Sequence, residues 1–253
     1  MPVAPNELKA ALQGDACQVG LWLNLGSAIS AEVAGNAGYD WCLIDAEHGP
    51  YDLAAIQAQV IALAGTGAEA VVRVPAAEDW MLKQVLDLGV RSVMVPMVES
   101  AAQAEALVRA VRYPPHGVRG FGATVARASG FGAVPDYAQT ADAETCLIVQ
   151  VESRAALNAL PEICAVEGVD VVFIGPTDLA ADMGYIADLN NQSVLDAIDR
   201  AIDTIVEAGK VPGIISLDRD VCAAYRDKGV RFLGVGSDAC LLASAVRATR
   251  HLP

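Results

Sequence analysis

The sequence predicts a (β/α)8 TIM barrel formed by one domain, residues 1–253. Three observations indicate this fold: the length of 253 residues, eight short apolar runs, and helix-patterned stretches between most of these runs. Strand and helix in alternation, repeated eight times over about 250 residues, is the pattern of a closed parallel barrel. Hydrophobic residues make up 54% of the chain, as expected for strands buried on both faces and for a surface partly covered by other subunits.

The predicted strands are short runs rich in Val, Ile, Leu and aromatic residues. In chain order they span residues 20–25, 41–45, 70–74, 92–98, 146–151, 170–175, 211–216 and 231–236. Stretches between them, such as DLAAIQAQVIALAG and VLDAIDRAIDTIVEAG, have the apolar spacing of helices. Gly65, Gly89, Gly209 and Gly229 follow helical stretches, where we expect a left-handed residue to end each helix.

One interval, residues 113–140, departs from this alternation. It reads YPPHGVRGFGATVARASGFGAVPDYAQT and is rich in Gly, Pro, Arg and Ser. Long irregular segments in compact domains usually have a function. We expect a loop that packs over a site or against a neighbouring subunit, and the alternative is a tolerated surface insertion.

Charge and composition exclude several classes of protein. The net charge of −14 argues against nucleic acid and anionic membranes as partners, because both require clustered Lys and Arg. The six cysteines form no CxxC pair, so we expect buried free thiols. The sequence has neither a signal peptide nor an apolar run long enough to span a membrane, and we expect a cytoplasmic protein.

Polar residues follow the predicted strands at the end where barrel enzymes have their active sites. They are Asp45-Ala46-Glu47-His48 after the second strand, Arg73 in the third, Glu152 after the fifth, Gly175-Pro176-Thr177-Asp178 at the sixth, Ser216 at the seventh and Ser237-Asp238 at the eighth. A single carboxylate at a strand end is often structural. The convergence of several such residues on one rim predicts an active site.

Glu152 and Asp178 suit a hard divalent cation. Mg²⁺ and Mn²⁺ prefer oxygen ligands and often take one or two carboxylates, with water and substrate completing the shell. A 2-keto acid supplies two further oxygens, and a cation there stabilises the enolate that forms on proton loss. The sequence contains no HxH or HExxH spacing, so a zinc site of the hydrolase type is not supported.

Two further side chains are candidates for the chemistry. Arg73 is placed to bind a keto oxygen and share the charge of an enolate, and its alternative role is an ion pair with a neighbouring helix. His48 follows a strand end beside acidic residues, a setting suited to general acid–base catalysis.

The lysines argue against a Schiff-base aldolase, which needs a Lys at a strand end. The chain has only four, and we expect Lys9, Lys83 and Lys228 on helices or at the N-terminus and Lys210 at the opposite end of the barrel.

The sequence resembles the HpcH/HpaI aldolase family, the class II pyruvate aldolases, including 4-hydroxy-2-oxoheptanedioate and 2-keto-3-deoxy-sugar-acid aldolases. The resemblance covers nearly the whole chain and rests on the motifs LIDAEHGP, VPMVES, RYPPHGVRG, ARAS, QVES and FIGPTDLAADMG. It implies a barrel whose last helix is exchanged between paired subunits, in a homohexamer built as a trimer of dimers. It also implies Mg²⁺, Mn²⁺ or Co²⁺ as the cofactor.

The resemblance also implies roles for individual residues. Glu152 and Asp178 match the metal ligands, His48 the acid–base residue, Asp87 the residue that pairs with that His, Asp45 a nearby acidic group and Arg73 the arginine that binds the keto oxygen. The substrate-binding residues are Arg73, Gln150, Gly175, Pro176, Thr177, Ile215 and Ser216. Thr177 stands where Ala or Ser is common and Ala46 where Gly is common. Together with Ile215 and Ser216, these departures leave the aldehyde preference open.

These observations lead to one hypothesis and two alternatives. The hypothesis is a metal-dependent aldolase, a carbon–carbon lyase that joins pyruvate or a related 2-keto acid, such as hydroxypyruvate, to an aldehyde. The first alternative is a lyase acting on a coenzyme A thioester, like citrate lyase β chains, which would need a basic path for the nucleotide. The second is a non-catalytic barrel that binds 2-keto acids.

Overall fold

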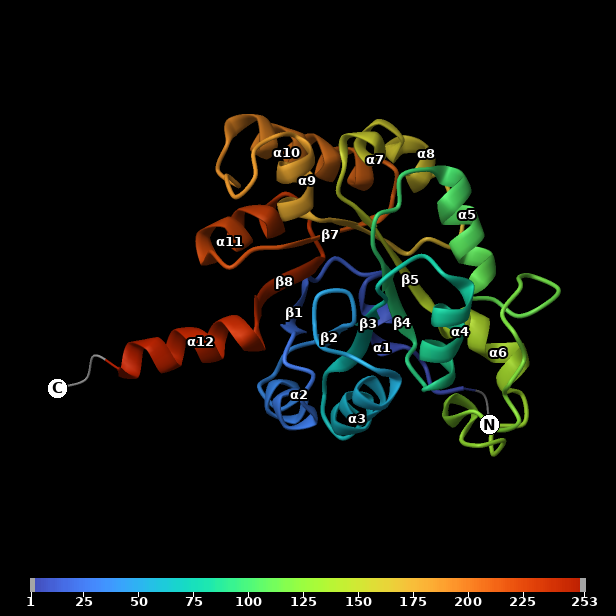
Figure 1. The fold of residues 1–253 in the computed structure, drawn as a ribbon. Coiled ribbons are helices and arrows are strands. Elements are labelled where there is room, and N and C mark those ends of the chain that lie inside the picture. Colours follow the sequence, from blue (N-terminus) through green and yellow to red (C-terminus); the bar gives the residue numbers. More distant parts are fainter. Residues whose placement is uncertain (1–2, 251–253) are drawn as a thin grey trace.

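The computed structural model describes residues 3–250 and shows a closed barrel of eight parallel strands surrounded by helices (Figure 1). The strands are β1 (Gln18–Leu23), β2 (Trp41–Asp45), β3 (Glu69–Arg73), β4 (Ser92–Val95), β5 (Cys146–Val151), β6 (Val171–Ile174), β7 (Val211–Ile215) and β8 (Phe232–Ser237). They pair in sequence order, and β8 closes the barrel against β1. The predicted (β/α)8 fold is confirmed.

The predicted strand bounds are correct to within two residues, except for β4. This strand ends at Val95 rather than at residue 98, because Met97 adopts a left-handed φ of 56° that interrupts the extended conformation. Among the expected left-handed glycines, Gly89, Gly209 and Gly229 have positive φ angles. Gly65 does not, so the prediction for that residue was wrong.

The chain also forms helices, most of which cover the outside of the barrel. They are α1 (Glu7–Ala11), α2 (Ala28–Gly35), α3 (Leu53–Leu63), α4 (Asp79–Asp87), α5 (Ala101–Ala110), the 3-10 turn η1 (Arg127–Ser129), α6 (Tyr137–Glu144), α7 (Arg154–Asn158), α8 (Leu160–Cys164), α9 (Pro176–Asp182), α10 (Gln192–Glu207), α11 (Arg219–Asp227) and α12 (Asp238–Thr249). Within residues 3–250, no helix combines the length and the apolar character needed to cross a membrane.

Aromatic rings fill the barrel interior. Trp41 stacks on Phe232 with ring centroids 4.0 Å apart, and Trp22 meets Phe173 at 5.5 Å. Space for the rings comes from glycines in the strands: a Cβ on Gly20 would lie 2.0 Å from the Trp41 ring. The interior is therefore a packed core, as in other barrels of this type.

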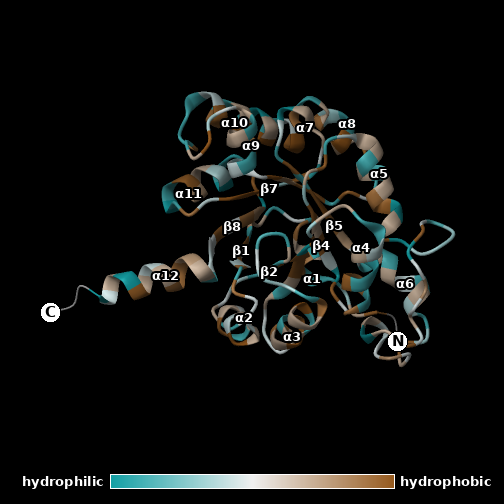
Figure 2. Ribbon diagram, viewed as in Figure 1, coloured by the Kyte–Doolittle hydropathy of each residue, from teal (hydrophilic) through white to brown (hydrophobic). Residues whose placement is uncertain are grey.

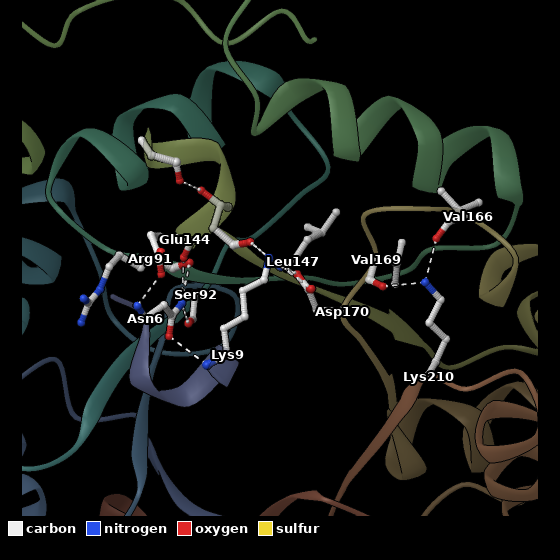
Figure 3. A network of polar contacts seen from close by, with 12 residues as sticks. Asn6, Lys9, Arg91, Ser92, Glu144, Leu147, Val166, Val169, Asp170 and Lys210 are labelled. Carbon is white, nitrogen blue, oxygen red and sulfur yellow. Dashed lines mark hydrogen bonds and ion pairs between the residues drawn. The ribbon is translucent and has the colours of Figure 1, made fainter. Parts of the chain in front are cut away.

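Helix α1 closes the N-terminal end of the barrel. Leu8 and Leu12 are buried in the same cluster as the interior aromatic rings. Lys9 donates its Nζ to the carboxylate of Asp170 at 3.2 Å, and the amide of Asn6 donates to groups near the starts of β4 and β5 (Figure 3). Helix α1 therefore covers the N-terminal end of the barrel.

The segment 113–140 joins α5 to β5 and therefore lies at the N-terminal end of the barrel. It contains η1 and the start of α6 and carries Arg119, which forms an ion pair with Asp87 at the end of α4 (2.8 Å) and stacks on the ring of Tyr113 (4.4 Å). The expectation that this segment packs over a site is wrong for its own barrel, because it lies at the opposite end.

Helix α12 departs from the barrel pattern. It extends away from the other helices (Figure 1) and carries apolar residues along its length (Figure 2). Its exposed apolar side chains include Leu241, Leu242 and Val246, each more than half exposed. On α2, Ile29 and Val33 are likewise uncovered, at 75% and 68% exposure.

Candidate active site

Arg73 and Asp45 form a buried ion pair at the C-terminal ends of β3 and β2. Arg73 donates Nε to Oδ1 of Asp45 at 2.9 Å and Nη2 to Oδ2 at 2.7 Å. Burial by itself would lower the pKa of Arg73, but the hydrogen bonds and charge of Asp45 raise it above its ordinary value. This two-point contact fixes the plane of the guanidinium and leaves Nη1 directed away from Asp45.

Nη1 of Arg73 forms an ion pair with Glu47 that lacks hydrogen-bond geometry. It lies 3.5 Å from Oε1 of Gln150, and Oε2 of Glu47 is 2.9 Å away but accepts no hydrogen bond. Glu47 follows β2 in the sequence, but it was not selected as a site residue from the sequence. Its position between Asp45 and His48 in the strand-end motif was the feature that could have identified it.

Glu152 is held at the same rim by two donors. The backbone N–H of Met97 donates to Oε1 at 2.9 Å, and the side-chain amide of Gln150 donates to Oε2. Gly175 makes room for this carboxylate, because a Cβ at that position would lie 2.2 Å from Oε2. The left-handed turn that ends β4 is therefore what brings the Met97 N–H to Glu152.

Three carboxylates, those of Glu47, Glu152 and Asp178, lie in this region with little positive charge nearby. Burial raises the pKa of Glu47 and of Glu152 above the ordinary carboxyl value, and the charge of Asp178 adds to both shifts. Asp178 is exposed in the first turn of α9. Asp45 neutralises Arg73, so the remaining carboxylates form a site whose charge a divalent cation would balance.

The donor set fits a cation of the Mg²⁺ type. The candidate ligands Glu152 and Asp178 are carboxylates, the ligands that Mg²⁺ and Mn²⁺ prefer. Within residues 3–250, no group of three His, Cys, Asp or Glu side chains forms a complete metal cage. A cation held by Glu152 and Asp178 would therefore keep positions for water and substrate.

His48 lies at the outer edge of the site. Its side chain is 64% exposed, and its Nε2 is 3.9 Å from Oε2 of Glu47. Asp45 positions the backbone of this turn, since its Oδ1 accepts the N–H of Glu47 at 3.1 Å and of His48 at 3.3 Å. The imidazole is thus accessible to a substrate in the barrel mouth.

The remaining predicted substrate residues lie at the ends of β6 and β7. Gly175 and Pro176 are buried at the start of α9, and Thr177 is exposed beside them. Ile215 packs against the barrel interior, and the backbone N–H of Ser216 donates to Gly234 at 3.0 Å. All of these residues lie at the C-terminal end of the barrel.

Asp87 is the exception among the predicted residues. It ends α4, whose direction places it at the opposite end of the barrel from His48, and it pairs with Arg119. The structure therefore does not bring Asp87 and His48 of one chain together. The sequence motif could not reveal this, because it does not specify the end of the barrel at which each residue lies.

The lysines lie where the sequence predicts them. Lys9 and Lys210 bind groups at the N-terminal end of the barrel (Figure 3), Lys83 is on α4, and Lys228 at the end of α11 pairs with Asp199. No lysine of the chain lies at the barrel mouth, and all four are among the residues that the structure describes. The geometry provides no amine for a Schiff base.

Known proteins resemble this chain over nearly its whole length. The family model described as HpcH/HpaI aldolase/citrate lyase matches residues 18–245. The chain is 52% identical over 248 residues to a hydroxypyruvate/pyruvate aldolase of Agrobacterium fabrum, covering 98% of this chain and 93% of the relative. It is 46% identical over 243 residues to a 4-hydroxy-2-oxo-heptane-1,7-dioate aldolase of Shigella sonnei, covering 96% and 93%.

A solved structure gives the same result. The HpcH/HpaI aldolase/citrate lyase family protein of Burkholderia cenocepacia superimposes with a TM-score of 0.93 at 41% identity, covering 96% of this chain and 97% of that one. The resemblance predicted from the motifs is confirmed, as is the expectation of a carbon–carbon lyase of the aldolase type. The chain belongs to the HpcH/HpaI aldolase/citrate lyase family.

Proposed function

We propose that this aldolase joins pyruvate or hydroxypyruvate to an aldehyde, and cleaves the product, through an enolate. The observation that carries the proposal is the connected set of Asp45, Arg73, Gln150 and Glu152 at one rim, in which Asp45 orients Arg73 without binding its Nη1. The names of the Agrobacterium and Shigella relatives support a 2-keto acid as one substrate.

Glu152 and Asp178 would hold the divalent cation, Mg²⁺, Mn²⁺ or Co²⁺. When bound, such a cation supplies Lewis-acid polarisation of the keto group. Gln150 and the Met97 N–H orient the Glu152 carboxylate, so that its position is set before any ligand arrives. The first turn of α9, around Gly175, Pro176 and Thr177, would bind the substrate carboxylate.

Arg73 would bind the keto oxygen through Nη1. Its other two donors are held by Asp45, so the guanidinium is already oriented for the developing negative charge on that oxygen. His48 would remove the C3 proton of the keto acid, directly or through a water, and return a proton to the aldehyde oxygen after addition. Ile215 and Ser216 border the space left for the aldehyde.

Asp87 can pair with a His48 only across a subunit boundary, since the two residues lie at opposite ends of one barrel. The assembly we propose is a hexamer, a trimer of dimers, with α12 exchanged within each pair. The uncovered apolar residues of α12 and of α2 support this exchange, because large exposed apolar patches usually mark contacts with another molecule.

The coenzyme A thioester alternative has less support. A nucleotide needs a basic path, but segment 113–140, which carries Arg119 and Arg127, lies at the end of the barrel away from the site. Solved citrate lyase β structures match at no more than 20% identity, which indicates a shared fold only.

The test is exchange of the C3 protons of pyruvate in D₂O, followed by proton NMR with Mg²⁺ or Mn²⁺ and then with EDTA. We expect exchange that requires the cation, and its loss in Glu152→Gln and Asp178→Asn. Asp182→Asn is the matched control, because Asp182 ends the same helix and pairs with the exposed Arg154. Full exchange by Asp178→Asn would contradict the metal assignment. No exchange by the unmodified enzyme would favour the thioester lyase or the binding barrel.

A further inference from the structure

Asp238 is a buried carboxylate at the base of α12 with partners outside its own helix. It is 8% exposed. Its Oδ1 accepts the backbone N–H groups of Asn24 and Ala239, both at 2.7 Å, and its Oδ2 accepts the hydroxyl of Ser30 at 2.6 Å. Asp238 thus joins the start of α12 to the loop after β1 and to α2.

Capping of α12 does not account for these contacts. Ser237 is the N-cap residue, and its hydroxyl accepts the N–H of Cys240 at 3.1 Å. Two of the three bonds made by Asp238 leave the helix altogether. A carboxylate needed only for the helix terminus would interact with the helix's own N–H groups.

Asn24 links Asp238 to the candidate active site. Its side-chain amide donates to Oδ2 of Asp45 at 2.7 Å, the oxygen that also accepts Nη2 of Arg73 at 2.7 Å. A carboxylate only accepts hydrogen bonds, so the Asn24 amide must present its NH2 group there. Asp238 holds the backbone of this residue, and the amide holds the carboxylate that orients Arg73.

We propose that Asp238 is a positioning residue that acts through Asn24 on Asp45 and Arg73, and so connects the base of α12 to the active site. The proposal rests on the proposed function, in which Arg73 binds the keto oxygen. In addition, the orientation of this arginine depends on the conformation of the chain where β8 ends and α12 begins.

The test is a double-mutant cycle of Asp238→Ala and Asn24→Ala. The measured quantity is the affinity for oxalate, a planar mimic of the enolate, by calorimetry with Mg²⁺. We expect Asp238→Ala to weaken binding about 10-fold, the size expected for losing a hydrogen bond to a charged group. In a protein that already carries Asn24→Ala, Asp238→Ala should weaken oxalate binding by less than about 2-fold, because the amide that links Asp238 to Asp45 is absent.

A second measurement needs no bound ligand. The rate at which phenylglyoxal modifies Arg73, followed by mass spectrometry, reports how firmly Asp45 holds the guanidinium. We expect faster modification in Asp238→Ala and Asn24→Ala than in the unmodified protein, and no further increase in the double variant. Asp238→Asn should preserve both properties, because its amide oxygen still accepts the Asn24 N–H. A failure of oxalate to bind the unmodified protein would count against the proposed function and leave this second measurement intact.

Asp170→Ala is the matched control. Asp170 also joins a helix to the barrel, accepting Lys9 Nζ at 3.2 Å and the N–H of Leu147 at 2.9 Å, but at the opposite end (Figure 3). It should lower the melting temperature without changing oxalate affinity or Arg73 modification. The proposal is overturned if Asp238→Ala behaves like this control, or if its effect is equal with and without the Asn24 amide.

Discussion

Gly175→Ala tests whether the position of the Glu152 carboxylate controls the site. The added methyl carbon would lie 2.2 Å from Oε2 and 2.9 Å from Cβ of Glu152, and 3.0 Å from Nε2 of Gln150. The φ of Gly175 is −86°, which alanine adopts without strain. The substitution therefore acts by steric contact and not through the backbone.

The size of the effect follows from this contact. Non-bonded heavy atoms settle more than about 3 Å apart, so the Glu152 oxygen must retreat by about 1 Å. This movement breaks or lengthens the bonds from Gln150 and from the Met97 N–H that hold the carboxylate. A displacement of this size at a reacting centre costs about 10²-fold in rate. We expect that loss in kcat/KM for pyruvate proton exchange, together with weaker Mn²⁺ binding.

The assay combines Mn²⁺ titration by electron paramagnetic resonance with the exchange rate. Gly65→Ala is the control, since a Cβ there meets nothing within 4 Å and Gly65 does not have a positive φ. Gly65→Ala should match the unmodified enzyme in both measurements. Unchanged Mn²⁺ affinity and exchange in a folded Gly175→Ala enzyme would refute the assignment of Glu152 as a ligand.

Two further predictions concern assembly and pH. If Asp87 pairs with His48 of a neighbouring subunit, mixed and reassembled His48→Ala and Asp87→Ala proteins should regain pyruvate proton exchange, because some sites then contain both intact residues. No recovery of exchange after confirmed subunit mixing would contradict the proposal. Burial raises the pKa of Cys164 to about 11 and of Cys42 to about 12 from an ordinary value of 9.0. As pH rises, the unfolded chain therefore loses its thiol protons before the folded protein does. The free energy of unfolding measured in urea should then fall as pH rises from 9 towards 11, and it should fall less steeply in Cys42→Ala. An equal dependence on pH in the two proteins would argue that Cys42 does not contribute to this fall.

Much of the fold could be predicted because its signals are local. A strand buried on both faces is a short apolar run, and the helices between strands have their own spacing. The β4 boundary was not predicted, since the left-handed turn at Met97 accompanies a contact of its N–H with Glu152, which is distant along the chain.

The rim residues could also be predicted, because parallel strands bring their C-terminal ends to one edge. The sequence therefore identified Asp45, Arg73 and Glu152 as neighbours. It could not show that Asp45 holds two donors of Arg73, or that Glu47 lies beside the third. These contacts depend on side-chain direction across strands that are far apart along the chain.

By itself the sequence determined the barrel and the family and predicted the rim of the proposed chemistry, since each follows from a pattern of neighbouring residues. Only the tertiary structure placed Asp87 at the opposite end from His48, left the apolar residues of α12 uncovered, and connected Asp238 to Arg73 through Asn24. These features arise from the direction of each helix and from contacts between distant segments, and no local pattern in the chain encodes them.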